Sequence, residues 1–221
     1  MGIYHTVESD AEAEIVVKKS RFIGHIVPVQ SVEEAERELA KIREVHKAAT
    51  HNCFAYRIGL GVPIERFSDD GEPSGTAGRP ILEVLRRRPI LNALVVVTRY
   101  FGGTLLGANG LIRAYADGAA QAIEAATVLR CVPMQKVSVT CDYGLYGKLE
   151  YELQQDGFSL EDKKYTDSVA FGFWVDTEGT KGVMDKIANL TGGQAHVEAA
   201  NPEYVGVRPD GSMVHSVLNQ G

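Results

Sequence analysis

The chain lacks any apolar run that approaches the roughly 20 residues needed to cross a bilayer. Its longest compact run, Leu94-Val95-Val96-Val97, has the length of a buried strand. Residues 1–10 lack a basic segment followed by an apolar one, so no secretory signal peptide is expected. We therefore expect a protein without a membrane anchor.

Cysteine is also scarce. The three cysteines are Cys53, Cys131 and Cys141, and no C-x-x-C pair occurs. This odd number and this spacing indicate neither a disulfide framework nor a zinc knuckle. Reduced thiols in a cytoplasmic protein fit best.

Basic residues are fewer than acidic ones: the chain has 23 Lys and Arg and 29 Asp and Glu, which gives a net charge of −6. An acidic chain argues against nonspecific coating of nucleic acid. The balance is uneven: residues 1–130 hold 16 charges of each sign, so the acidic excess lies in residues 131–221. The segment 79–113 holds six arginines and one acid, Glu83. A local basic patch is therefore compatible with an acidic whole.

With 221 residues, 44% of them apolar, the chain can bury a sizeable core. Ser31, with Glu34 three residues later, is a candidate helix N-cap. Apolar alternation and helical stripes predict the elements of the first half, in chain order: strands over 14–17 and 21–29, a helix from Ser31 to about 45, strands over 51–59 and 64–67, a helix over 79–88, a central strand over 91–101 and a helix over 107–129.

A boundary is expected at 130–135, where Pro133 lies. The pattern then restarts in the order βαββαβ, which is the ferredoxin-like arrangement. The sequence thus predicts an α/β (α+β) protein with a first domain over 1–130, a ferredoxin-like domain over 131–208 and a polar tail over 209–221.

Turn-forming residues fill 68–78 (SDDGEPSGTAG). Three carboxylates lie within four residues, on Asp69, Asp70 and Glu72, and such oxygen ligands can hold Mg²⁺ or Ca²⁺. The EF-hand alternation is absent. Two interpretations stay open: a divalent-cation site, and an acidic turn that caps the helix at Arg79. Ser74 has no G-x-S-x-G around it, so it is not predicted as a nucleophile.

Glycines punctuate the stretch 99–110 (RYFGGTLLGANG), between a strand and a helix. Helix N-terminal N–H groups attract anions, and glycine lets phosphate approach the backbone. No named motif fits, because Ala108-Asn109 replaces the Lys-Ser/Thr of a P-loop and G-x-G-x-x-G is absent. Anion binding and tight strand–helix packing both stay open. Arg99 and Arg113 flank the loop, and guanidinium groups recognise phosphate or carboxylate well.

Two further patterns favour structural interpretations. A cysteine and a histidine can act as nucleophile and base, but Cys53 with His51 and His46 lacks an identifiable orienting acid. The aromatic stretch 170–175 (AFGFWV) partly echoes an RNA-binding strand. The alternation of Val169, Phe171, Phe173 and Val175 more simply faces a core.

Three strings resemble the YigZ/IMPACT family: Thr50–Arg57 (THNCFAYR), Ser68–Pro80 (SDDGEPSGTAGRP) and Val96–Tyr115 (VVTRYFGGTLLGANGLIRAY). The resemblance is strong over about 14–127 and weaker in the second half. It implies a first domain folded like domain 2 of ribosomal protein S5, and a domain pair similar to the last two domains of translocase-type elongation factors. Eukaryotic relatives, by this resemblance, act in translational control by competing for an activator of a kinase that phosphorylates an initiation factor.

The resemblance also implies one family surface, without assigning roles to its residues. We expect the acidic loop and the glycine loop to converge there beside guanidinium groups. The candidate ligand- or anion-binding residues are Arg79, Arg99, Tyr100, Gly102, Gly103, Gly107, Gly110, Arg113 and Tyr115. The candidate polar-loop residues are His51, Asp69, Asp70, Glu72, Ser74 and Thr76.

We therefore expect a cytoplasmic, non-catalytic binding protein linked to translation or its regulation, which contacts RNA, the ribosome or a translation-associated protein through the Asp69–Arg113 surface. No catalytic motif is identifiable and no cofactor is expected. Two alternatives stay open. One is a protein or enzyme that binds a nucleotide or phosphate metabolite at Gly102–Gly110, with a divalent cation at Asp69, Asp70 or Glu72. The other is a protein–protein module without a ligand.

Overall fold

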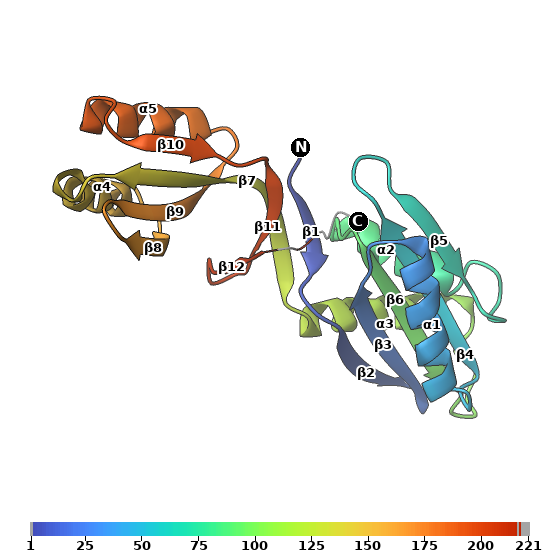
Figure 1. Cartoon of the computed structure of the whole chain (residues 1–221). Helices are drawn as coiled ribbons and strands as arrows, with labels where there is room; N and C mark the ends of the chain where they lie inside the picture. Colours follow the sequence, from blue (N-terminus) through green and yellow to red (C-terminus); the bar gives the residue numbers. More distant parts are fainter. Residues whose placement is uncertain (1, 216, 218–221) are drawn as a thin grey trace. The chain divides into compact units, whose positions relative to one another are not determined.

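The computed structural model describes residues 2–215 and 217, and it divides the chain into two compact units (Figure 1). The larger unit consists of Ile3–Cys131 together with the segment that begins at Gly206. The smaller unit consists of Val132–Val205 with the first two residues. The described strands form antiparallel ladders in both units. The α+β class predicted from the sequence is confirmed.

A five-stranded sheet is the frame of the larger unit. Its strands, in the sheet order β2-β3-β6-β4-β5, are β2 (Ala11–Val17), β3 (Ser20–Pro28), β6 (Ala93–Tyr100), β4 (His51–Ile58) and β5 (Ile64–Ser68). The first seven residues of β6 are all buried. This run is the strand expected to be central, and β6 lies between β3 and β4 with both neighbours antiparallel.

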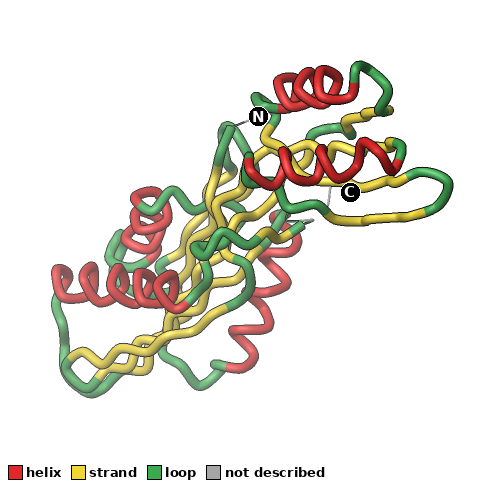
Figure 2. Tube along the Cα trace, turned by 90° about the vertical axis from the view of Figure 1, so that its left-hand side faces the viewer, coloured by secondary structure: helices red, strands yellow, loops and turns green. Residues whose placement is uncertain are grey.

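Helices cover both faces of this sheet, so β6 is apolar on both sides (Figure 2). Leu94 and Val96 pack with helix α1 (Val32–Val45) on one face, which we call the α1 face. Val95 and Val97 pack with α2 (Gly78–Arg87) and α3 (Ala108–Ala125) on the opposite, α2/α3 face. Because side chains alternate along a strand, neighbouring residues of β6 point to different faces.

The start of α1 follows the predicted capping pattern. The hydroxyl of Ser31 accepts a hydrogen bond from the Glu34 N–H at 3.1 Å. The Glu34 carboxylate accepts from the Gln30 N–H at 2.7 Å, one residue before the cap. A capping-box carboxylate normally returns to the cap residue itself. Here it fixes the chain that enters the helix.

Two glycines let β3 and α3 touch through their backbones. A Cβ built on Gly24 would lie 2.2 Å from the carbonyl oxygen of Gly118. No side chain fits at that distance, so glycine at position 24 is a packing requirement. The close approach fixes α3, and the loop before it, against the β2–β3 hairpin.

The smaller unit follows the predicted βαββαβ order. Its elements are β7 (Val128–Cys141), α4 (Tyr143–Gln155), β8 (Glu161–Tyr165), β9 (Val169–Asp176), α5 (Thr180–Thr191) and β10 (His196–Ala199), with the pairing order β10-β7-β9-β8. This arrangement is consistent with a ferredoxin-like fold. Phe171 and Phe173 are buried in its core, as the simpler interpretation of that stretch predicted.

Other elements differ from the prediction. Strands β1 (Tyr4–Val7), β11 (Glu203–Val207) and β12 (Met213–Val214) were not expected. Helix α3 ends at Ala125, earlier than expected. Strand β7 runs through the segment 130–135 that was expected as a boundary, and the two units divide between Cys131 and Val132, within that segment. Pro133 lies between the β7 residues that pair with β1 and those that pair with β9, so its missing N–H interrupts neither ladder. Of the expected tail, residues 216 and 218–221 lie outside the described residues.

Candidate functional site

The acidic loop and the glycine loop line one cavity of about 370 Å³ in the larger unit, which we call the loop cavity. Glu72 and Pro73 line it from the acidic loop. Phe101, Leu105 and Gly107 line it from the glycine loop. Two segments about 30 residues apart in the sequence thus meet, and β6 brings them together because it ends between them.

A buried hydrogen-bonded ion pair forms the floor of the loop cavity. Nη1 of Arg99 donates to Oε1 of Glu72 at 2.6 Å, and the Tyr115 hydroxyl donates to the same oxygen at 2.7 Å. The Arg99 and Glu72 side chains are only 6% and 4% exposed. Nε2 of His51 lies 3.8 Å from Oε1 of Glu72. We call these four residues the Glu72 network.

The Glu72 network compensates the charge of Arg99 inside the protein. Its guanidinium also lies 5.4 Å from the ring centroids of Phe22 and Phe101. A phosphate that bound Arg99 would have to compete with a carboxylate already in place. Arg99 is therefore a framework residue of the cavity rather than an available cation.

Burial holds the Tyr115 phenol and the Cys53 thiol of this region in their neutral forms. Burial raises the pKa of the Tyr115 phenol far above its ordinary range, and the neighbouring Cys53 and Glu72 act in the same direction. Burial also raises the pKa of the Cys53 thiol to about 12. The Cys53 Sγ donates to the Asp69 carbonyl oxygen at 3.0 Å. A neutral, buried thiol of this kind is a poor nucleophile.

The Asp69 carboxylate holds the acidic loop onto the start of α2. Its Oδ1 accepts from the N–H groups of Ala77 and Gly78 at 3.0 and 2.8 Å, and its Oδ2 accepts from Gly75 at 2.8 Å. The cap residue Ala77 has no side-chain oxygen, so Asp69 supplies the acceptors that this helix start needs. These contacts support the capping interpretation.

Asp70 joins the same loop to β4. Its Oδ2 accepts from the Asn52 N–H at 2.7 Å, and Arg43 donates to Oδ1 at 3.3 Å. Its carbonyl oxygen accepts from Nδ1 of His51 at 2.7 Å. A divalent cation at Asp69 and Asp70 would have to displace these donors.

The remaining predicted residues are split between the interior and the surface. Thr76 is buried and its hydroxyl donates to the Pro73 carbonyl oxygen at 2.6 Å. Ser74 is exposed. Arg79 and Arg113 are also exposed, near the starts of α2 and α3, and neither forms an ion pair within the described part of the chain.

Tyr100 does not join the loop cavity. It follows Arg99 directly in β6, so it points to the α1 face, where its hydroxyl shares a 2.9 Å hydrogen bond with Nδ1 of His46. The predicted set of site residues therefore lies on two faces of the sheet. The sequence analysis placed Tyr100 on the same surface as Arg99, although adjacent residues of a strand point to opposite faces of a sheet.

The glycine loop combines packing and exposure. A Cβ on Gly102 would lie 2.0 to 2.4 Å from backbone atoms of Lys19 and Ser20, so this glycine is needed for close packing. Gly103 and Gly107 adopt left-handed conformations, with φ of 82° and 74°. Gly110 is in the first turn of α3, where a Cβ would meet Cβ of Leu106 at 3.0 Å.

The rim of the loop cavity is apolar and open to solvent. Leu105 is 82% exposed and Phe101 is 47% exposed. Ile112, beside Arg113 in α3, is also exposed. The loop cavity thus has a hydrogen-bonded polar floor and exposed apolar side chains at its rim.

Sequence reasoning missed a second group of ionisable side chains, on the α1 face. Glu12, His25 and His46 each offer a ligand atom within 4.8 Å of the others. The β2–β3 hairpin places Glu12 directly opposite His25. The only clue in the sequence was that hairpin register, since the three residues are far apart in the chain and form no motif.

The fold and the site define a two-unit α+β protein with a cavity lined by the acidic loop and the glycine loop of its larger unit. Residues 18–123 match the Impact N-terminal domain, and residues 139–194 match the Domain of unknown function (DUF1949). The chain is 41% identical over 202 residues to the IMPACT family member YvyE of Bacillus subtilis, covering 91% of this chain and 93% of that protein. The chain belongs to the IMPACT family, as the resemblance predicted.

Two other comparisons define how far the similarity extends. Protein IMPACT of Rattus norvegicus is 37% identical over 100 residues, which are 43% of this chain and 31% of that protein. A crystal structure described as that of a hypothetical protein matches with a TM-score of 0.58 and 30% identity, covering 91% of this chain and 98% of that chain. Within the described residues, no helix has both the length and the apolar character needed to cross a membrane.

Proposed function

We propose that this chain is a cytoplasmic, non-catalytic binding protein linked to translation, and that the rim of the loop cavity docks on a protein of the translation apparatus. Membership of the IMPACT family supports the link, because eukaryotic members of this family are connected with translational control. The observation that carries the docking is the apolar rim, above all Leu105 at 82% exposure.

The rim favours a protein partner over RNA. Nucleic-acid binding depends on free cations that contact phosphates. Arg99 is buried and paired with Glu72, so it offers no free cation to a phosphate, and Arg79 and Arg113 are exposed near the starts of α2 and α3. Exposed leucine and phenylalanine around a rigid cavity instead suit the well-packed centre of a protein–protein interface.

The experiment is a binding titration of the full chain against purified ribosomes and a panel of purified translation factors, across a salt series. Leu105→Ser should lower the affinity for the partner at least tenfold, about 1.4 kcal/mol. Val62→Ser is the matched control, because Val62 is 95% exposed but belongs to the β4–β5 connection. The control should bind like the wild type.

Two results would contradict a protein-docking rim. One is unchanged binding by Leu105→Ser. The other is binding that disappears steeply with salt and is lost in Arg113→Ala alone, which would indicate phosphate contacts to RNA.

A second candidate function is the binding of a nucleotide or phosphate metabolite. It rests on α3, which begins at the loop cavity with Gly107 as its cap and no capping side chain. Free N–H groups at a helix start attract phosphate. A ligand at 100 times its Kd would stabilise the fold by roughly 2.7 kcal/mol. Thermal unfolding with nucleotides, with and without Mg²⁺, tests this candidate, and the absence of any shift would remove it.

A further inference from the structure

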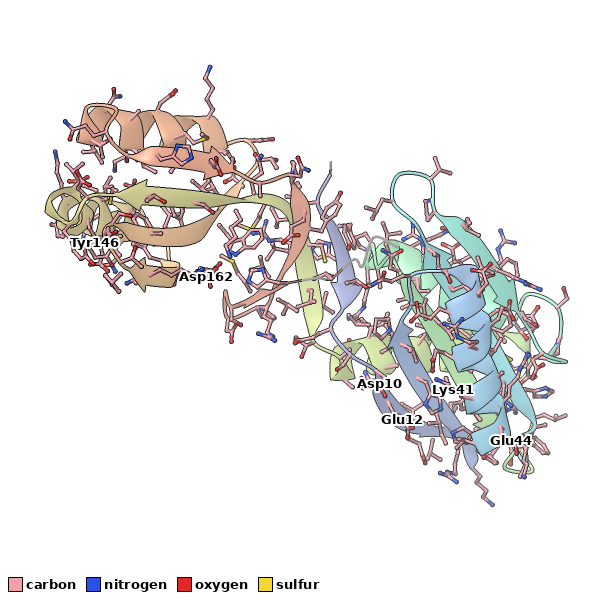
Figure 3. The ribbon with its side chains drawn as sticks, in the orientation of Figure 1. Asp10, Glu12, Lys41, Glu44, Tyr146 and Asp162 are labelled. Carbon is pink, nitrogen blue, oxygen red and sulfur yellow. The ribbon has the colours of Figure 1, made fainter. Side chains whose placement is uncertain are left out.

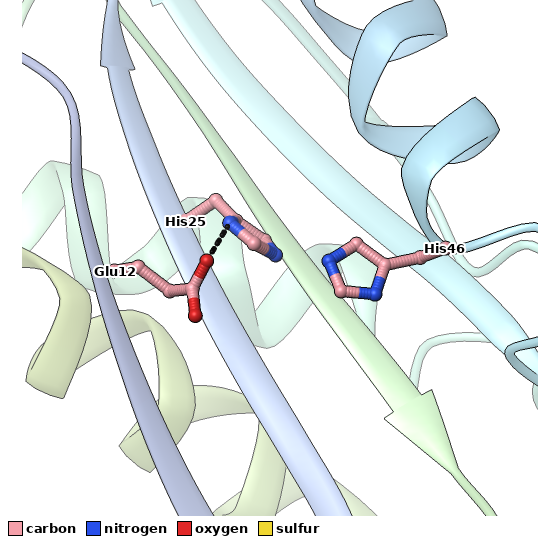
Figure 4. A group of neighbouring side chains, drawn as sticks. All are labelled: Glu12, His25 and His46. Carbon is pink, nitrogen blue, oxygen red and sulfur yellow. Dashed lines mark ion pairs between the residues drawn. The ribbon is translucent and has the colours of Figure 1, made fainter.

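The α1 face carries three potential metal ligands that the loop cavity does not use. Glu12 lies on β2 and His25 on β3, directly opposite each other in the hairpin. His46 ends α1, where its backbone N–H bonds to the Ile42 carbonyl oxygen and its ring turns toward the sheet. Figure 4 shows the two imidazole rings facing each other, with Glu12 on the far side of His25.

The distances place these groups within reach of one ion. An oxygen of Glu12 lies 3.2 Å from Nδ1 of His25. The His25 and His46 ring centroids are 5.0 Å apart. One ligand atom from each residue lies within 4.8 Å of the others. Tetrahedral coordination at about 2.1 Å places ligand atoms roughly 3.4 Å apart, so ligand atoms up to 4.8 Å apart must move toward each other to share one ion.

The Nε2 atom of His25 is the observation that points to a ligand. His25 is only 9% exposed, and this nitrogen is buried without a hydrogen-bond partner among the residues that the structure describes. It is the nitrogen on the side that faces His46 (Figure 4). A buried polar atom without a partner costs about 1–3 kcal/mol, so structures rarely keep one without a reason.

The Nδ1 atoms of His25 and His46 each contact an oxygen, as the second ring nitrogen of a metal-binding histidine does. Such histidines donate their second N–H to a carboxylate or another oxygen, which fixes the tautomer and orients the ring. Here Nδ1 of His25 has the Glu12 carboxylate, and Nδ1 of His46 has the Tyr100 hydroxyl at 2.9 Å. In the tautomers that carry the proton on Nδ1 of both rings, the two Nε2 lone pairs are available to coordinate.

We propose that Glu12, His25 and His46 form a binding site for one divalent transition-metal ion, zinc being the ion that best matches their donor atoms. The two imidazoles are the nitrogen ligands, and the Glu12 carboxylate orients the His25 ring from its Nδ1 side, on the side away from His46. Imidazole suits zinc and its neighbours, whereas Mg²⁺ and Ca²⁺ prefer sites made of oxygen alone.

The surroundings suit a cation. Burial lowers the pKa of His25, with His46 acting in the same direction and Glu12 opposing it, so the ring is held in its neutral, ligating form. A cavity of about 570 Å³ adjoins Glu12 and His25, and Asp10 and Glu38 also line it. Figure 3 shows Asp10 and Glu12 near β2, and Lys41, which pairs with Glu38, on α1. Water from this cavity can complete the coordination.

The experiment is a metal titration of the full chain after treatment with a chelator. Cobalt(II) serves as the spectroscopic probe, and zinc affinity is measured by competition with a chromophoric chelator. The wild type should bind one ion, with ligand-field absorption bands of nitrogen and oxygen coordination. His25→Gln and His46→Gln should weaken binding at least 100-fold, and Glu12→Gln about 10- to 100-fold.

His196→Gln is the matched control. Nε2 of His196 lies 2.9 Å from Glu198, which reproduces a histidine–carboxylate pair, but both side chains are 72% exposed and no second imidazole faces them. This variant should bind like the wild type. The proposal is overturned if His25→Gln binds zinc as tightly as the control, if no cobalt bands appear, or if equal concentrations of Mg²⁺ or Ca²⁺ displace the ion.

A measurement on the unsubstituted chain covers the case in which a variant misfolds. In nitrogen-15 NMR spectra, zinc should shift the ring-nitrogen resonances of His25 and His46 and leave those of His196 in place. Zinc binding that leaves the His25 and His46 resonances unmoved overturns the proposal.

Discussion

Buried ionisable side chains lie on both faces of the five-stranded sheet, and they differ in how each group is compensated. On the α2/α3 face, the Glu72 carboxylate receives hydrogen bonds from Arg99 and Tyr115. On the α1 face, His25 keeps a buried nitrogen without a partner, and its carboxylate neighbour Glu12 is 61% exposed. The Nε atom of Arg99 also has no hydrogen-bond partner among the described residues, so the two faces differ in how a buried charge is paired: Arg99 has the buried Glu72 carboxylate, whereas His25 has only an exposed one.

The largest expected change in stability comes from removing the carboxylate of one face, and the comparison is with the same substitution on the other face. Glu72→Ala leaves the Arg99 charge buried and unpaired, which should cost about 3–5 kcal/mol of unfolding free energy. Glu12→Ala removes an exposed partner and should cost less than about 1 kcal/mol. Urea denaturation of the two variants measures both values. Equal losses would show that the two faces do not differ in this way.

A smaller effect is expected at the acidic loop. Asp69→Ala removes three acceptor contacts at the start of α2 and should cost about 1–2 kcal/mol, the range of other helix caps. Asp69→Asn keeps one acceptor oxygen and should cost less. Ser74→Ala, in an exposed part of the same loop, should stay within about 0.5 kcal/mol. A loss at Ser74 as large as that at Asp69 would refute the capping role.

The α1 face should respond to pH. Burial lowers the pKa of His25 in the folded chain, so the unfolded chain takes up a proton first when the pH falls below about 6.5. The contribution of the neutral ring to stability is complete above that pH and is lost on acidification, by at most about 1.4 kcal/mol per pH unit for one proton.

Denaturation of the chelator-treated protein between pH 5 and 8 measures that pH response. His25→Gln should flatten the profile, and His196→Gln should retain it. A wild-type profile that His25→Gln leaves unchanged would assign the response to other groups.

The smallest effect on stability is expected at the rim of the loop cavity. Leu105→Ser and Arg113→Ala change exposed side chains without an ion pair in the described residues, so each should stay within about 0.5 kcal/mol. Thermal unfolding checks this expectation. A large loss of stability would mean that the rim belongs to the framework, and reduced binding could then not be ascribed to docking.

Much of the fold could be predicted because its patterns are long. The continuous apolar run of β6, the Ser31 cap and the βαββαβ order of the second half all appear in the structure. Strands β1 and β11 were missed because four or five residues give too short an alternation to distinguish from a loop. Pro133 suggested a boundary, and the two units divide between Cys131 and Val132, although β7 continues through that segment as one strand.

The site was harder to predict than the fold. Composition and spacing located the acidic and glycine loops, which do share a cavity. They could not show that Arg99 is paired internally with Glu72, because that pair depends on tertiary contacts between segments 27 residues apart. The Glu12–His25–His46 group likewise depends on a hairpin register and on where α1 ends. Neither leaves a local pattern in the sequence.

The larger unit is made of two separate stretches of the chain, and this limits when it can finish folding during synthesis. Residues 206, 207, 213 and 214, which form the β11–β12 pairing, belong to the unit that begins at Ile3, whereas Val132–Val205 belong to the other. Domains generally fold as units while the ribosome extends the chain. The whole inserted stretch Val132–Val205 must therefore be synthesised before the β11–β12 pairing of the larger unit can form, so the larger unit is the later of the two to be completed.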